Sequence, residues 1–156
     1  MPIKRLNHAV LWVRDATASA AFYHDVLGFE IVHNLGGTAI FLRADGSAND
    51  HDLGLFTVGQ RPAAPSHAPG LYHLAWQVHT IDELAALRVK LAAAGSLAGE
   101  SDHGVSKSLY AKDIDGIEFE VMWASPRASW PPDASTAPLD LVGELARWSG
   151  VDTADQ

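Results

Sequence analysis

The stretch LYHLAWQV, residues 71–78, repeats the pattern of an earlier stretch, LNHAVLWV, residues 6–13. Both run through apolar residues typical of a buried strand, and both carry a histidine at the third position, His8 in the first and His73 in the second. A chain that repeats a structural unit places equivalent residues in equivalent positions. The repeat therefore predicts two copies of one unit, with each histidine in the first strand of its copy.

Each copy continues with the signals of one helix. In the first copy, Asp15 is one of several residues that can cap a helix N-terminus, and Gly28 can end that helix. In the second copy, Thr80 and Glu83 form the pattern of a capping box, and Gly95 follows as the stop. Because the same order recurs, we expect the two helices to be equivalent as well.

Three strands are expected after each helix. In the first copy they span residues 29–32, 37–43 and 52–58; in the second they are a weakly signalled strand near 96–98, then 106–112 and 117–123. The predicted fold class is α+β, with two βαβββ units forming one domain. The expected domain covers 4–124, as units 4–58 and 70–124 joined by a linker at 59–69. A C-terminal extension, 125–156, is expected to carry a short helix near 139–148.

The composition argues against several classes of function. The chain of 156 residues has a net charge of −8, which disfavours nucleic acids and anionic membranes as partners, since both attract basic surfaces. It has no cysteine, which excludes disulfides, thiolate metal sites and a cysteine nucleophile. No apolar run approaches the length of a membrane span, and the N-terminus lacks the apolar core of a signal peptide. We therefore expect a soluble cytoplasmic protein.

The candidate for chemistry is a set of two histidines and one carboxylate. The last predicted strand carries Glu118 and Glu120, which lie on one face if the strand is regular. A carboxylate among apolar strand residues costs several kcal/mol to bury unless it is paired or bound to a metal. With His8 and His73, one such carboxylate would complete the facial triad of non-haem Fe(II) oxygenases. The alternative is that the histidines are ordinary strand residues and the glutamates form a solvated edge.

Four stretches of the chain resemble the vicinal oxygen chelate superfamily. They are LNHAVLWVRD at 6–15, AFYHDVLGFE at 21–30, GLYHLAWQV at 70–78 and DIDGIEFEVMW at 113–123. That superfamily includes glyoxalase I, bleomycin-resistance proteins, fosfomycin-resistance enzymes and type I extradiol dioxygenases. The resemblance covers roughly residues 4–124 and implies a curved mixed sheet around a metal site. It implies metal ligands at the positions matched here by His8, His73 and Glu120.

The pattern is most similar to that of the type I extradiol dioxygenases. The resemblance places His103 and Tyr110 as catalytic residues beside the metal, with His103 as the acid–base candidate. It implies Fe(II), with Mn(II), Zn(II) or Ni(II) as other metals that accept nitrogen and oxygen ligands. The substrate would be a catechol, with dioxygen as co-substrate, and a homodimer is expected. Ile114 departs from the family pattern, which has proline there. The expected pocket walls are His51, Phe56, Trp76 and Trp123, with Phe41 as a further candidate.

Other activities of the same superfamily stay open. Glyoxalase I enzymes carry a fourth ligand, a glutamate on the last strand of the first unit, where this chain has Gly54 or Leu55. Thiol transferases of the fosfomycin type share the three ligands but need a phosphonate-binding site, and basic residues in the second unit are few. A metal-free drug-binding protein and an isomerase or epimerase are further alternatives.

The position of Tyr110 depends on one turn. If the DIDG turn, residues 113–116, has four residues, Lys112 pairs with Ile117, and Leu109 shares the face of Glu120. Tyr110 reaches that face only if a bulge or an unusual loop shifts the register. Tyr110 would otherwise be a core aromatic residue, and His103 a surface loop residue.

Overall fold

The computed structural model describes residues 5–60, 70–133 and 135–153, which fall into two compact units, Met1–Ala68 and Pro69–Gln156. The first unit contains β1 (Ala9–Val13), α1 (Ala16–Leu27), β2 (Glu30–Asn34), β3 (Ala39–Arg43) and β4 (Leu53–Thr57). The second contains β5 (Leu74–Gln77), α2 (Ile81–Ala93), β6 (Leu97–Asp102), β7 (Ser106–Lys112) and β8 (Glu118–Ala124), followed by a 3-10 turn, η1 (Arg127–Ser129), and α3 (Leu141–Trp148). Residues 61–69 of the predicted linker, and residue 4 at the start of the predicted domain, lie outside the described residues.

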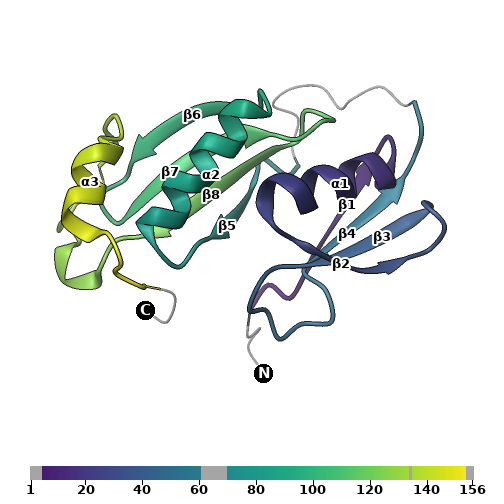
Figure 1. The fold of residues 1–156 in the computed structure, drawn as a ribbon, viewed down its shortest axis with the longest axis horizontal. Helices are drawn as coiled ribbons and strands as arrows, with labels where there is room; N and C mark the ends of the chain where they lie inside the picture. Colours follow the sequence, from purple (N-terminus) through teal and green to yellow (C-terminus); the bar gives the residue numbers. More distant parts are fainter. Residues whose placement is uncertain (1–4, 61–69, 134, 154–156) are drawn as a thin grey trace. The chain divides into compact units, whose positions relative to one another are not determined.

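Both units have the same topology, which confirms the α+β class and the βαβββ repeat. The strand order is β1-β4-β3-β2 in one sheet and β5-β8-β7-β6 in the other. In each sheet the first and last strands of the unit pair in parallel, and the other pairs are antiparallel. One helix lies on one face of each sheet, as Figure 1 shows for α1 and α2. That the units form one domain around a metal stays a prediction.

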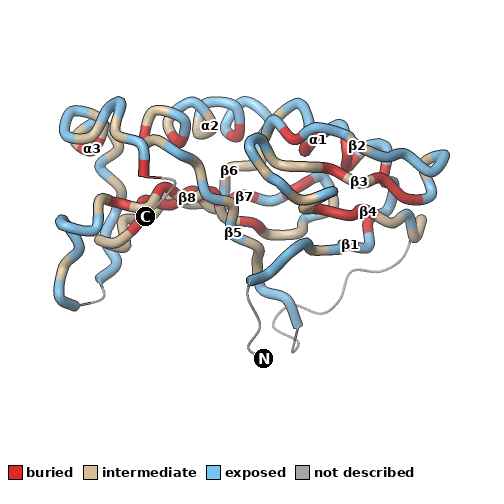
Figure 2. The backbone as a smooth tube through the Cα atoms, turned by 90° about the horizontal axis from the view of Figure 1, so that it is seen from below, coloured by how far each residue is buried: buried red, intermediate tan, exposed pale blue. Residues whose placement is uncertain are grey.

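The helices begin and end where the sequence signals predicted. The Asp15 carboxylate accepts hydrogen bonds from the N–H groups of Thr17 and Ala18, and Gly28 closes α1 at φ 80°. Thr80 and Glu83 form the complete capping box of α2. Figure 2 shows that buried residues lie along the strands and on one side of these helices, which is the core of each unit. None of the helices in the described parts of the chain has the length and apolar character needed to span a bilayer.

Three strands that bear on the site, β1, β5 and β6, differ in their bounds from the expectation. His8 and His73 lie directly before β1 and β5 and are therefore not strand residues. The strand near 96–98 extends further than expected, since β6 runs through Asp102 with a register shift between Leu97 and Gly99. The polar residues GESD do not show the apolar alternation by which strands are recognised. Such alternation is not required in β6, because β6 lies at the edge of its sheet.

The loop that joins β7 to β8 sets the register on which the site depends. The loop has five residues, 113–117, and hydrogen bonds between its first and last residues close it. The Asp113 N–H donates to the Ile117 carbonyl at 3.0 Å. Its carboxylate accepts from the N–H groups of Asp115 and Ile117, both at 2.9 Å. Lys112 consequently pairs with Glu118, and Tyr110 lies directly opposite Glu120. In place of the expected four-residue turn, the structure has a five-residue loop held by the Asp113 carboxylate. This loop places Tyr110 on the same face as Glu120.

We expect Asp113→Ala to destabilise the fold by about 1–3 kcal/mol, because it leaves two loop N–H groups without their acceptor. Urea unfolding measures the change. Ile114→Ala is the matched control, because Ile114 is 51% exposed in the same loop and its truncation should cost less than about 0.5 kcal/mol. Equal losses in the two variants would show that the Asp113 carboxylate does not hold the loop.

Candidate active site

The second unit brings His73 and Glu120 together. In the parallel pairing of β5 with β8, Ala75 lies beside Glu120. His73 comes two residues before Ala75 and therefore points to the same face of the sheet as Glu120. The His73 Nε2 atom and the Glu120 Oε2 atom are 3.2 Å apart, and the two side chains are 23% and 12% exposed. Two ligand atoms that each lie about 2.1 Å from one metal, at right angles, are about 3 Å apart. The pair therefore has the spacing of neighbouring ligands on one ion.

Aromatic contacts hold the His73 ring in place. Its centroid lies 4.6 Å from that of Tyr72 and 5.8 Å from that of Tyr110. Its Nδ1 atom is buried and has no hydrogen-bond partner within the described residues. The orientation of Nε2 toward Glu120 therefore comes from packing between two tyrosines. The neighbouring Tyr72 hydroxyl donates a hydrogen bond to the Glu118 carboxylate, which raises the pKa of Tyr72, so Glu118 faces this same side of the unit.

Tyr110 and His103 form a hydrogen-bonded pair next to these residues. The Tyr110 hydroxyl is 2.8 Å from His103 Nε2, and the other ring nitrogen of His103 is 3.2 Å from the Thr136 hydroxyl. Burial, together with the negative charge of Glu120, raises the pKa of Tyr110, which keeps its hydroxyl protonated at neutral pH. Four side chains thus follow one another across unit two: Glu120, Tyr110, His103 and Thr136.

In the first unit His8 lies among aromatic side chains. The His8 and His51 ring centroids are 4.6 Å apart, and those of His51 and Phe41 are 4.8 Å apart. Phe56 continues the row, with its centroid 5.8 Å from Phe41. Each histidine has its Nδ1 atom 2.9 Å from a side-chain oxygen of the preceding residue, Asn7 for His8 and Asp50 for His51. Bonds of this type leave Nε2 as the outward nitrogen of each ring.

Gly54 takes the place in the first unit that Glu120 takes in the second. Val10 pairs with Gly54 as Ala75 pairs with Glu120, and Phe41 lies opposite Gly54 as Tyr110 lies opposite Glu120. A Cβ atom at Gly54 would be 3.4 Å from both Phe41 and Val10. Of the two candidates for the fourth glyoxalase-type ligand position, Gly54 is therefore the match, and it offers no ligand atom.

Two of the expected pocket walls lie elsewhere. Trp123 is 0% exposed and shares the buried face of β8 with Phe119 and Val121, opposite to Glu120. Trp76 pairs with Val121 and therefore points to that same core face. The expectation for these two residues is wrong: Trp123 lies three positions after Glu120, and an odd number of positions along a strand reverses the face.

The sequence missed Tyr72 and Thr136 as neighbours of the site. Tyr72 directly precedes His73, so its position beside the candidate ligand was the available signal. No sequence signal pointed to Thr136, because it lies in a proline-rich segment without periodicity, 33 residues from His103.

The donor set fits a divalent metal of intermediate hardness. An imidazole nitrogen and a carboxylate oxygen suit Fe(II), Mn(II), Zn(II) and Ni(II) alike. In the parts of the chain that the structure describes, no group of three or more His, Cys, Asp or Glu side chains could hold a metal. His73 and Glu120 are the pair that unit two supplies, and the role of His8 as the third ligand stays a prediction.

A family model matches residues 5–121, that of the Glyoxalase/Bleomycin resistance protein/Dioxygenase superfamily. The chain belongs to this superfamily. Its resemblance to the vicinal oxygen chelate proteins, stated above from sequence motifs, is thereby confirmed. The match runs from the first unit into β8 of the second, so the C-terminal extension, 125–156, lies outside it.

Individual relatives carry different names within the superfamily. A catechol-2,3-dioxygenase of Bacillus subtilis (strain 168) is 38% identical over 150 residues, which are 90% of this chain and 50% of that protein. The chain thus spans about half the length of that relative. A glyoxylase/bleomycin resistance protein/dioxygenase domain from Frankia sp. EAN1pec has a TM-score of 0.64 at 24% identity, covering 81% of this chain and 96% of that one. A lactoylglutathione lyase from Agrobacterium tumefaciens has a TM-score of 0.59 at 24% identity, with coverages of 79% and 96%. At such identity these two structures show the fold alone.

Proposed function

We propose that the protein is an extradiol dioxygenase, which inserts both atoms of dioxygen at a ring carbon–carbon bond next to the two hydroxyls of a catechol. The observation that carries the proposal is the convergence of His73, Glu120, Tyr110 and His103 on one face of unit two. The similarity to a catechol-2,3-dioxygenase supports the same activity.

His8, His73 and Glu120 would hold Fe(II), which when bound supplies sites for the catechol oxygens and for dioxygen. Glu120 contributes the negative charge that balances part of the charge of the ion. Gly54 adds no fourth protein ligand, so more positions stay open for small molecules than in a four-ligand isomerase site. His51 and Phe56, beside His8, would line the pocket for the aromatic ring.

Tyr110 and His103 would carry out the proton transfers of the reaction. The Tyr110 hydroxyl stays protonated and donates to His103, so its oxygen can accept a hydrogen bond from a substrate hydroxyl near Glu120. When a catechol hydroxyl gives its proton to the Tyr110 oxygen, Tyr110 can pass its own proton to His103 Nε2, 2.8 Å away, and stays protonated throughout. Deprotonation of a catechol hydroxyl and protonation of the opened ring both require such a carrier. The homodimer stays a further prediction of this proposal.

Oxygen uptake with a panel of catechols tests the proposal. We expect one dioxygen consumed per catechol, a yellow ring-opened product, and a kcat about 100-fold lower in His103→Ala, which is the lower end of general acid–base effects. His79→Ala is the control, since the His79 side chain is exposed and faces Asp152, away from the residues proposed for the site. A metal-loaded protein that consumes no oxygen with any catechol, but isomerises or conjugates other substrates, would refute the dioxygenase proposal.

A further inference from the structure

The C-terminal extension is anchored to unit two at several points. Asp102, at the end of β6, forms a two-way backbone bridge with Ala137, with both N–H to carbonyl distances at 2.8 Å. The Lys107 ammonium is 2.5 Å from the Asp102 carboxylate and 3.8 Å from Glu144 in α3. Near the end of the chain, Thr153 donates its hydroxyl hydrogen to the Ala124 carbonyl at 2.8 Å. The extension is thus a fixed part of the unit.

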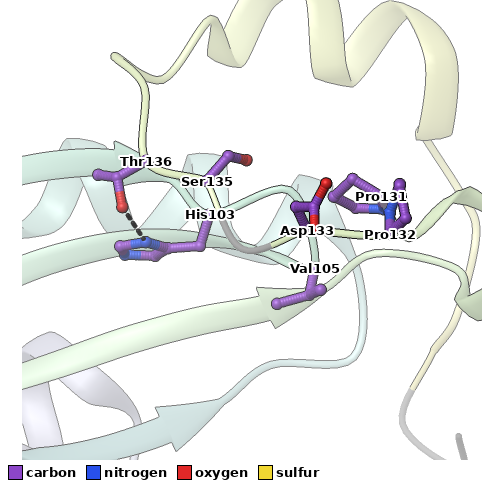
Figure 3. A pocket seen from close by; sticks show the side chains of 7 residues that line it. All are labelled: His103, Val105, Pro131, Pro132, Asp133, Ser135 and Thr136. Atoms are coloured by element: carbon purple, nitrogen blue, oxygen red, sulfur yellow. Dashed lines mark hydrogen bonds between the residues drawn. The ribbon is translucent and has the colours of Figure 1, made fainter.

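This anchoring places the Thr136 hydroxyl beside His103, the candidate acid–base residue. The residue next to Ala137 is Thr136, whose Oγ1 lies 3.2 Å from His103 Nδ1 (Figure 3). His103 itself follows Asp102, so the backbone bridge fixes both partners of this contact. The two residues line one side of an open pocket of about 450 Å3, whose other walls are Val105, Pro131, Pro132, Asp133 and Ser135.

The chemistry of the two hydroxyls that contact His103 favours one arrangement of the ring proton. A neutral imidazole carries its proton on one nitrogen and accepts at the other. Both hydroxyls can donate or accept, but the Tyr110 phenol is more acidic than the Thr136 alcohol and is the better donor, so we assign the ring nitrogen that meets Tyr110 as the acceptor. The proton then sits on Nδ1, where the Thr136 oxygen can accept it.

From this geometry we infer that Thr136 is a positioning residue: it accepts a hydrogen bond from His103 Nδ1 and thereby keeps Nε2 free to accept the Tyr110 proton. The inference rests on the proposed function for its catalytic meaning, while the tautomer itself is a property of the protein alone. The extension would therefore tune a residue of the site although it lies beyond the region that the family model matches.

Nitrogen-15 NMR of the imidazole rings in the metal-free protein tests the inference without turnover. The His103 signal is identified by its loss in His103→Gln. We expect the Nδ1–H tautomer to dominate in the wild type and to lose population to Nε2–H in Thr136→Val, which keeps the shape of the side chain but removes the acceptor. Thr136→Ser should restore the wild-type ratio, and Ser135→Ala, which removes the neighbouring hydroxyl, should leave it unchanged.

Kinetics of the iron-loaded protein give the second measurement. Thr136→Val should lower kcat about fivefold to tenfold with KM unchanged, because one neutral hydrogen bond is worth about that factor. Thr136→Ser should recover most of the loss. An unchanged tautomer ratio in folded Thr136→Val would overturn the inference. A shifted ratio in a protein that turns over no catechol would uphold the positioning and refute the dioxygenase instead.

Discussion

Glu120→Gln should abolish stoichiometric binding of Fe(II). The substitution keeps the size of the side chain and removes the charge that faces His73 Nε2 at 3.2 Å. Loss of a partner that only orients a ligand costs about 10- to 100-fold in metal affinity, so loss of a ligand itself should exceed that range. Elemental analysis of anaerobically purified protein, without an affinity tag that binds metals, measures the stoichiometry.

Thermal unfolding supplies a second readout for the same variant. A metal that binds only the folded chain stabilises it by about 2.7 kcal/mol at a concentration 100 times its Kd. Added Fe(II) should therefore raise the Tm of the wild type and leave that of Glu120→Gln unchanged.

Glu118→Gln is the matched control for this prediction. Glu118 lies two residues away on the same face of β8, but its partner is Tyr72. The control should keep its iron and its metal-dependent Tm. If Glu118→Gln lost the metal and Glu120→Gln retained it, the ligand assignment would shift by two residues along the strand. Retention in both variants would remove β8 from the metal site altogether.

The sequence predicted those parts of the molecule that local rules determine. The repeat, the helix caps and the place of Glu120 on the last strand follow from spacing along single elements, and the structure has these as expected, whereas His73 lies directly before β5 and not in it. The face on which Trp123 lies was also within reach, because its odd separation from Glu120 already places it on the opposite side of β8. A stricter use of strand alternation would have removed it from the pocket.

The register between β7 and β8 was harder to predict, because it depends on hydrogen bonds that the Asp113 side chain makes within the connecting loop. The letters DIDG suggest a four-residue turn, and only the bonds from the Asp113 carboxylate reveal a fifth residue in the loop. That one residue moves Tyr110 from the core face to the face of Glu120. The contact between His103 and Thr136 was beyond prediction, because a long irregular segment separates the two residues. Local patterns therefore determine the elements of this site, while loops and the extension determine how its catalytic side chains meet.

Lys107→Met should be the most destabilising substitution in the extension's anchor, with a loss of about 3–5 kcal/mol in the free energy of unfolding. The Lys107 side chain is 6% exposed and faces two carboxylates, Asp102 and Glu144, which are 25% and 12% exposed. Removal of the cation leaves Asp102 partly buried without its counter-charge and Glu144 with only the exposed Arg147 among the described residues, 3.9 Å away, which is the costly way to break a buried ion pair. Urea unfolding at pH 7 measures the loss.

Arg88→Met tests whether burial causes the effect. Arg88 makes two 2.8 Å contacts with Glu100, but its side chain is 43% exposed, so its loss should cost less than about 1 kcal/mol. A Lys107→Met variant no less stable than Arg88→Met would show that the Lys107 cluster does not anchor the extension.

The stability gap between wild type and Lys107→Met should also depend on pH. Burial raises the pKa of the Asp102 carboxyl, but hydrogen bonds from Lys107 and the Gly104 N–H outweigh it, and the net pKa is lowered. A carboxyl with a lowered pKa in the folded state stabilises the fold above its unfolded pKa of about 3.9, and this contribution is lost as the pH falls toward the folded value. The variant lacks the Lys107 bond, so its Asp102 contributes less at neutral pH. The gap should therefore be full at pH 7 and shrink below about pH 4, and a gap that widened with acid would contradict the role given to this ion pair.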